Sequence, residues 1–346
     1  MILKTNGKKN LNGLSLPEMQ AFVKELGEPL YRGKQLYRWL YGKGIRTFDE
    51  MTNLSMQLRG KLQDVAYLGS LQPVNILHSQ KDSSVKYLFC LEDGLKIESV
   101  LMVDEKRATL CVSTQVGCAI DCKFCATGMM GLKRNLTVAE IVEQFFSVQQ
   151  LSGKTITNVV CMGMGEPFQN YDNLMHACGI LTNVEGPNLS NRHIVVSTSG
   201  ILPKIYQFTD EDRKYKLAIS LNATNDESRL QLMPLNKKWP IRDLVKAVIY
   251  YTRKANQRVT FEYVLLSGMN DTPADAERLR QLLQGIHCKL NLIPYNATFG
   301  VYKRPSKERV EAFYKSFESF DVPVTVRWSK GDDIKAGCGQ LAGENL

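Results

Sequence analysis

The sequence lacks any long apolar run. No stretch of about 18 apolar residues occurs, so no membrane-spanning helix is expected. The first ten residues, MILKTNGKKN, also lack the apolar core of a secretory signal peptide. The nine cysteines are an odd number scattered over a long chain, which does not suit a framework of disulfide bonds. These absences predict a protein of the reducing cytoplasm.

The composition is that of a globular protein in which Lys and Arg outnumber Asp and Glu. The 346 residues are enough for one large domain and a small one. A hydrophobic content of 44% and a mean hydropathy of -0.22 are typical of a soluble chain. The net charge is +9. Charge alone is compatible both with ordinary solubility and with an anionic partner such as RNA.

Three cysteines lie close together in the segment GCAIDCKFCATG, residues 117–128. Cys118, Cys122 and Cys125 follow the pattern C-x3-C-x2-C. A zinc site normally needs four protein ligands, often as paired C-x2-C units. Three thiolates on one loop instead suit a [4Fe–4S] cluster in which one iron is left open for a substrate or cofactor. This spacing resembles that of the radical SAM superfamily.

The first hundred residues are expected to form two small regions. Residues 1–75 are predicted to be a helical accessory domain of RNA-binding type, with Ser15 and Glu18 in a capping box and many basic residues. Residues 76–103 are predicted to hold a β-hairpin, because apolar residues alternate on both sides of the turn Glu92-Asp93-Gly94.

The region 104–330 is expected to be an α/β core. Six mostly apolar strands alternate with helices, which favours a partial (β/α)6 barrel; the resemblance of the cysteine loop implies that this is the radical SAM barrel. In such barrels function lies at the carboxyl ends of the strands. A further strand is expected at 324–328, before a mobile tail at 331–346. The six expected strands cover residues 110–113, 158–162, 194–197, 217–221, 259–264 and 290–293.

Polar side chains follow several of these strands. The second strand ends in Gly163-Met164-Gly165-Glu166-Pro167, where glycines allow close approach of a ligand and Glu166 offers an acceptor for an amine. Ser197, Ser220, Asn222 and Asn296 end other strands. Each alone is also compatible with a turn or cap residue.

Two further cysteines stand out. Cys338 is flanked by glycines in the tail, which predicts a mobile and exposed thiol rather than a core thiol. Cys111 lies one strand before the cluster loop, so its side chain could reach the same cavity. With the cluster loop, the GMGEP segment and the tail GDDIKAGCGQL, the whole chain resembles the RlmN family of radical SAM RNA adenine methyltransferases.

The resemblance implies the cofactors and the roles of individual residues. Cys118, Cys122 and Cys125 would hold the [4Fe–4S] cluster, which cleaves S-adenosylmethionine (SAM) to a 5′-deoxyadenosyl radical. Cys338 would be methylated by a first SAM, lose a hydrogen atom from that methyl group and add to the adenine. Cys111 would resolve the adduct through a transient disulfide with Cys338. Glu98 would be the proton acceptor, although its place in the hairpin is also compatible with a solvent-facing residue. The SAM contacts would be Gly165, Glu166, Ser197, Ser220, Leu221, Asn222 and Asn296.

The resemblance also implies the substrates and partners. The substrates would be 23S rRNA, methylated at C2 of adenosine 2503, and tRNAs, methylated at C2 of adenosine 37. A one-electron donor such as flavodoxin would be a further partner, and no association with a membrane is expected. Many members of the family have His where this chain has Asn222, which would change any SAM contact made by that side chain.

Two alternatives remain open on the sequence. The related Cfr group shares these motifs and methylates C8 of the same rRNA adenine. A non-catalytic iron–sulfur RNA-binding protein is the alternative of another class, and the GMGEP segment and the two additional cysteines argue against it.

Overall fold

The computed structural model describes residues 7–298 and 301–342. A ten-stranded mixed sheet runs through it in the order β14-β13-β12-β11-β10-β9-β6-β5-β4-β3. The strands from β6 to β14 are parallel, and those from β3 to β6 are antiparallel. The strands of this sheet are β3 (Gln72–His78), β4 (Ser84–Cys90), β5 (Lys96–Asp104), β6 (Arg107–Cys111), β9 (Asn158–Cys161), β10 (Ile194–Thr198), β11 (Lys216–Ser220), β12 (Val259–Leu265), β13 (Cys288–Pro294) and β14 (Val324–Val326).

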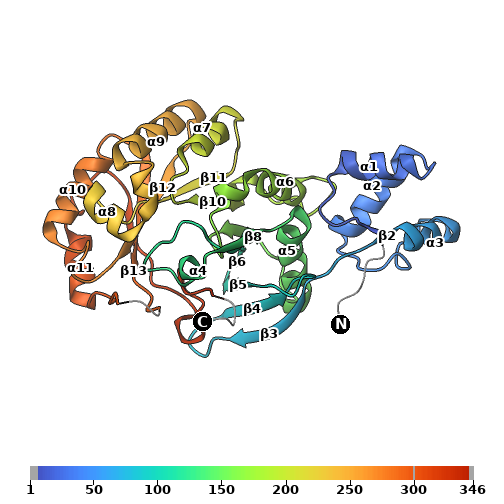
Figure 1. Ribbon diagram of the computed structural model, residues 1–346, viewed down its shortest axis with the longest axis horizontal. Coiled ribbons are helices and arrows are strands. Elements are labelled where there is room, and N and C mark those ends of the chain that lie inside the picture. The colour runs from blue at the N-terminus through green and yellow to red at the C-terminus, as the bar shows by residue number, and fades with distance from the viewer. Residues whose placement is uncertain (1–6, 299–300, 343–346) are drawn as a thin grey trace.

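Helices cover the outer side of the parallel strands, which gives the open α/β barrel that the sequence predicts (Figure 1). All six expected strands form, and the further strand expected at 324–328 is β14, paired with β13. No helix in the described ranges is long and apolar enough to cross a membrane. The helices of this region are α4 (Ala126–Met129), α5 (Val138–Ser152), α6 (Tyr171–Thr182), α7 (Leu202–Asp210), α8 (Asp226–Leu232), α9 (Ile241–Ala255), α10 (Pro273–Leu283) and α11 (Lys307–Lys315).

Three helices form a separate group at the N-terminal end of the molecule (Figure 1). They are α1 (Leu16–Glu25), α2 (Leu30–Tyr37) and α3 (Met56–Val65), with a short parallel pair, β1 (Lys9–Asn10) and β2 (Ala66–Tyr67). The predicted capping box at the start of α1 is present, because Ser15 N donates to Glu18 Oε2 at 2.7 Å.

A buried polar contact joins this helical group to the barrel. Glu143 on α5 accepts two hydrogen bonds of 2.8 Å from Arg46 and one from Asn12. Burial raises the pKa of Glu143 to about 6, although Arg46 acts in the opposite direction. Removing Arg46 would leave a buried carboxylate without its ion-pair partner, which typically costs about 3–5 kcal/mol.

The hairpin predicted around residues 92–94 is formed by β4 and β5, and β3 extends it to three antiparallel strands. The sequence did not predict β3. Most side chains of this edge strand are exposed, so it lacks the apolar alternation that marks a half-buried strand.

Candidate functional site

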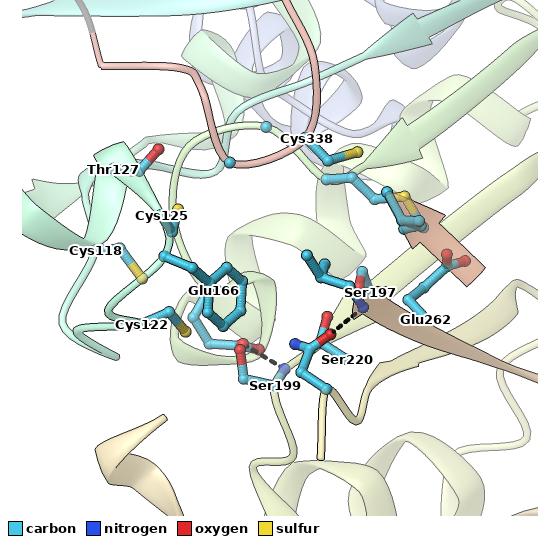
Figure 2. A pocket seen from close by; sticks show the side chains of 18 of the residues that line it. Cys118, Cys122, Cys125, Thr127, Glu166, Ser197, Ser199, Ser220, Glu262 and Cys338 are labelled. Carbon is cyan, nitrogen blue, oxygen red and sulfur yellow. Dashed lines mark hydrogen bonds between the residues drawn. The ribbon is translucent and has the colours of Figure 1, made fainter. Parts of the chain in front are cut away.

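A pocket lies at the carboxyl ends of the parallel strands. Figure 2 shows Cys118, Cys122 and Cys125 on one side of it and Cys338 with Glu262 across from them, with Ser197 and Ser220 between. The structure therefore brings together residues that are more than 200 positions apart in the chain. Its polar and thiol lining comprises Cys118, Cys122, Cys125, Thr127, Cys161, Glu166, Ser197, Thr198, Ser199, Ser220, Asn222, Glu262, Tyr295, Asn296 and Cys338.

The three thiols of the cluster loop are held by backbone contacts between β7 (Gln115–Gly117) and α4. Cys125 N donates to Cys122 O at 3.1 Å, and Lys123 N donates to Leu232 O at 2.9 Å. Burial raises the pKa of Cys118 to about 12, so three neighbouring thiolates need a cationic group to stabilise them. Three thiols on one loop suit a [4Fe–4S] cluster in which they hold three irons and leave the fourth open.

Glu166 is buried in the loop that follows β9. Its Oε2 accepts from Ser199 N at 2.7 Å and its Oε1 accepts from Phe168 N at 3.0 Å. Burial raises the pKa of Glu166, and these hydrogen bonds oppose the rise. Each carboxylate oxygen can accept a second hydrogen bond, so the group can still receive an ammonium from the pocket.

The two glycines of this segment are closely packed against neighbouring parts of the chain as well as lining the pocket. A Cβ on Gly165 would lie 2.5 Å from Gln115 Cβ, and a Cβ on Gly163 would lie 2.7 Å from Val112 O. Gly165 also has a φ of +100°, which favours glycine. Close packing against the protein's own backbone and side chains already excludes larger residues at both positions.

The remaining predicted SAM contacts differ in their surroundings. Ser197 and Ser220 face the pocket, whereas Leu221 does not line it and uses its backbone N and O for bonds to Glu262 and Arg229. Asn222 has a φ of 58°, and its Oδ1 accepts from Val264 N at 2.9 Å. Its side chain therefore joins the ends of β11 and β12.

The tail reaches the pocket through several anchors. Asn296 Nδ2 donates to Cys338 O at 3.1 Å, and Ala126 N of the cluster loop donates to Gly339 O at 2.7 Å. Farther along, Thr127 Oγ1 donates to Leu341 O at 2.5 Å. The sequence predicts a mobile tail, and in the structure its described part is held in place with the Cys338 side chain exposed to the cavity.

Cys111 and Glu98 lie beside this pocket without lining it. Cys111 is the last residue of β6 and is buried. Burial is the main cause of the raised pKa of its thiol, and the nearby thiol of Cys338 raises this pKa further. Both thiols are free. Glu98 is also buried, not solvent-facing. It pairs with Lys86 at 3.0 Å and accepts from Ala342 N of the tail at 2.8 Å.

The sequence did not identify two charged residues of this region, Glu262 on β12 and Arg327 after β14. Glu262 Oε1 accepts from Asn291 Nδ2 at 2.9 Å, while its buried Oε2 has no hydrogen-bond partner within the described residues. The nearby thiol of Cys338 is the main cause of the raised pKa of Arg327, and Glu262 raises this pKa to a smaller extent. The available signal was alternation along β12: Glu262 shares a face with Val264, which also lines the pocket.

Comparison with known proteins identifies two matching families. Residues 9–68 match the family described as ribosomal RNA large subunit methyltransferase N-terminal domain, and residues 112–283 match the radical SAM superfamily. The chain is 46% identical over 333 residues to a probable dual-specificity RNA methyltransferase RlmN of Thermoanaerobacter sp. (strain X514), covering 96% of this chain and 97% of that protein.

Two further comparisons agree. A protein of the same description from Lysinibacillus sphaericus (strain C3-41) is 44% identical over 342 residues, covering 98% of this chain and 90% of the relative. The crystal structure of a radical SAM methyltransferase from Sphaerobacter thermophilus superposes with a TM-score of 0.93 at 45% identity, covering 97% of this chain and 100% of that one.

Proposed function

Because the chain belongs to the RlmN family of radical SAM RNA methyltransferases, which use a [4Fe–4S] cluster and SAM, we propose that it methylates C2 of adenine in RNA. The proposed substrates are adenosine 2503 of 23S rRNA and adenosine 37 of tRNAs. The observation that carries the proposal is the meeting of three cluster-loop thiols, a buried carboxylate and a tail thiol in one pocket.

The residues that would hold the cofactors are those that line the pocket. Cys118, Cys122 and Cys125 would bind the cluster. Glu166 would accept from the amino group of SAM, while Ser197 and Ser220 would meet its polar groups. When bound, the cluster supplies the electron that cleaves SAM, and SAM supplies the methyl group and the 5′-deoxyadenosyl radical. Gly165, Leu221, Asn222 and Asn296 would shape and support this pocket.

Cys338 would carry the carbon to the base. Its thiolate would attack the methyl carbon of one SAM and displace S-adenosylhomocysteine. The S-methyl group would then lose one hydrogen atom to the 5′-deoxyadenosyl radical derived from a second SAM, and the remaining methylene radical would add to adenine C2. The carbonyl of Cys338 is held by Asn296, which keeps the thiol over the pocket. The exposed position of this thiol allows both SAM and an adenine to reach it.

Release of the product would use Cys111 and a base. Once the carbon–carbon bond has formed, Glu98 would remove the proton from adenine C2 while the unpaired electron of the adduct passes to an acceptor such as the oxidised cluster. The sulfur of Cys111 would then attack that of Cys338, and the electron pair of the breaking sulfur–carbon bond would stay with the methylene carbon, which takes a proton from solvent. This leaves a Cys111–Cys338 disulfide. Since Glu98 accepts from Ala342 N, its action requires the end of the tail to move. A one-electron donor such as flavodoxin would supply the reducing electron.

The test uses protein with its cluster reconstituted without oxygen, a reductant, methyl-labelled SAM and unmodified 23S rRNA or tRNA. Mass analysis of the nucleosides should show labelled 2-methyladenosine. Cys338→Ala should abolish the product with the cluster intact, whereas Cys90→Ala, a matched change outside the pocket, should retain it. Labelled 8-methyladenosine, or product from Cys338→Ala, would contradict the proposal.

A further inference from the structure

A second cavity, of about 830 Å³, opens at the opposite ends of the barrel strands. It lies where β10, β11, β12 and β13 begin, whereas the pocket described above lies where the strands end. We call it the basic cavity, and it is lined by Ser190, Asn191, Arg192, Lys214, Lys216, Asn256, Gln257, Arg258, Thr260, His287 and Lys289.

The basic cavity is separated from the first pocket by a layer of hydrogen-bonded polar residues. Thr260 and Glu262 share one face of β12, and Lys289 and Asn291 share one face of β13. Asn291 Nδ2 donates to Glu262 Oε1 at 2.9 Å, and Thr325 Oγ1 donates to Asn291 Oδ1 at 2.7 Å. Glu262 lines the first pocket and Thr260 lines the basic cavity, so the two are distinct sites at either mouth of one barrel.

All charged side chains of this lining are basic. Among the described residues, the lining includes five Lys or Arg side chains and no Asp or Glu. Among the residues that the structure describes, Lys214 alone of these five forms an ion pair with a carboxylate, that of Asp212 at 2.6 Å. Burial is the main cause that lowers the pKa of Lys289; Glu262 opposes this effect, and the charge of Lys216 adds to it. An anionic ligand would offset the repulsion among these cations.

The composition of the lining indicates which anion fits. Arg and Lys side chains together match the oxygens of phosphate groups, and Thr260, Asn191 and Asn256 add neutral polar groups that can donate hydrogen bonds. Among residues 7–298 and 301–342, no Phe, Tyr or Trp lines the cavity, so they offer no aromatic surface there on which a nucleic-acid base could stack. Recognition here would therefore use phosphate groups and not the identity of a base.

We propose that the basic cavity binds two or more closely spaced phosphate groups of one polyanion. Five cations on a concave surface exceed what a single phosphate needs, and a cavity of about 830 Å³ has room for several. Such phosphates could belong to a free polyphosphate compound or to the backbone of the RNA substrate, and the same side chains would bind either.

The test compares wild-type protein with the triple variant Lys216→Gln, Arg258→Gln, Lys289→Gln. Inorganic tripolyphosphate should bind the wild type in isothermal titration and should bind the triple variant roughly tenfold or more weakly. RNA affinity is measured in parallel over a range of salt concentrations. If the phosphates are those of RNA, the triple variant should also bind RNA more weakly, with the slope of log K against log salt reduced by roughly two to three. An unchanged RNA affinity would assign the cavity to a free polyphosphate.

A matched control removes three charges elsewhere. Lys154→Gln, Lys307→Gln, Lys315→Gln alters exposed residues outside both cavities. Thermal unfolding and cluster content of each variant verify that the protein remains folded. The proposal is overturned if the triple variant and this control bind both tripolyphosphate and RNA equally well.

Discussion

Replacement of Glu166 by Gln tests the SAM-binding part of the account. The two oxygens of Glu166 accept from two different backbone amides, Ser199 N and Phe168 N. Gln has only one oxygen, so its NH2 group must face one of these N–H donors. The donor left unsatisfied in a buried position should cost about 1–3 kcal/mol of stability. Loss of the negative charge should remove a further interaction of about 1.5–3 kcal/mol with the ammonium of SAM, which corresponds to roughly 10- to 150-fold weaker binding.

The assay is equilibrium binding of SAM to Glu166→Gln protein whose cluster content equals that of the wild type. Glu211→Gln, which alters a carboxylate outside the pocket, serves as the matched control and should bind SAM as the wild type does. Because burial raises the pKa of Glu166, lowering the pH should weaken SAM binding to the wild type at pH values above those at which an exposed Glu titrates. An affinity of Glu166→Gln within about twofold of the wild type would refute this role.

Three further predictions concern stability and the tail. The pKa of Glu143 is raised from 4.5 to about 6 on folding, so the free energy of unfolding should fall by about 2 kcal/mol as the pH rises from well below 4.5 to well above 6; urea unfolding of Glu143→Gln should lack this fall, and the same pH dependence in both proteins would contradict the assignment. Gly165→Ala should destabilise the protein by about 1–3 kcal/mol, because its Cβ would clash with Gln115 at a φ of +100°; an unchanged Tm would show that the segment can relax. Asn296→Ala should slow methylation of Cys338, measured by peptide mass, while SAM cleavage continues, because it frees the carbonyl of that residue; an unchanged methylation rate would show that the other anchors suffice.

Local chemistry explains why much of the fold could be predicted. The capping box at Ser15 depends on Glu18, three positions farther along the chain, and it forms in the structure. The six core strands are buried apolar runs, which the sequence shows directly. The edge strand β3 was missed because an exposed strand has no apolar pattern to reveal it.

The sequence was a better guide to which residues form the site than to the hydrogen bonds that these residues make. Cys118 and Glu166 could be located from short motifs. The engagement of Asn296 with the tail could not, because it depends on a partner 42 residues away. Glu262 was missed for a related reason: alternation along β12 puts it on the same face as Val264, but which face of the strand lines the pocket is shown only once the strands are assembled.

The central claim is that Cys338 carries the methyl carbon to adenine and that this carbon loses a hydrogen atom on the way. The most direct measurement supplies SAM with a trideuterated methyl group and counts deuterium in the methyladenosine produced. The expected product is 2-methyladenosine with two deuterium atoms, because the 5′-deoxyadenosyl radical takes one deuterium and a hydrogen from solvent replaces it when the product is released. A product that retains all three deuterium atoms would mean that an intact methyl group is transferred, and it would contradict the account.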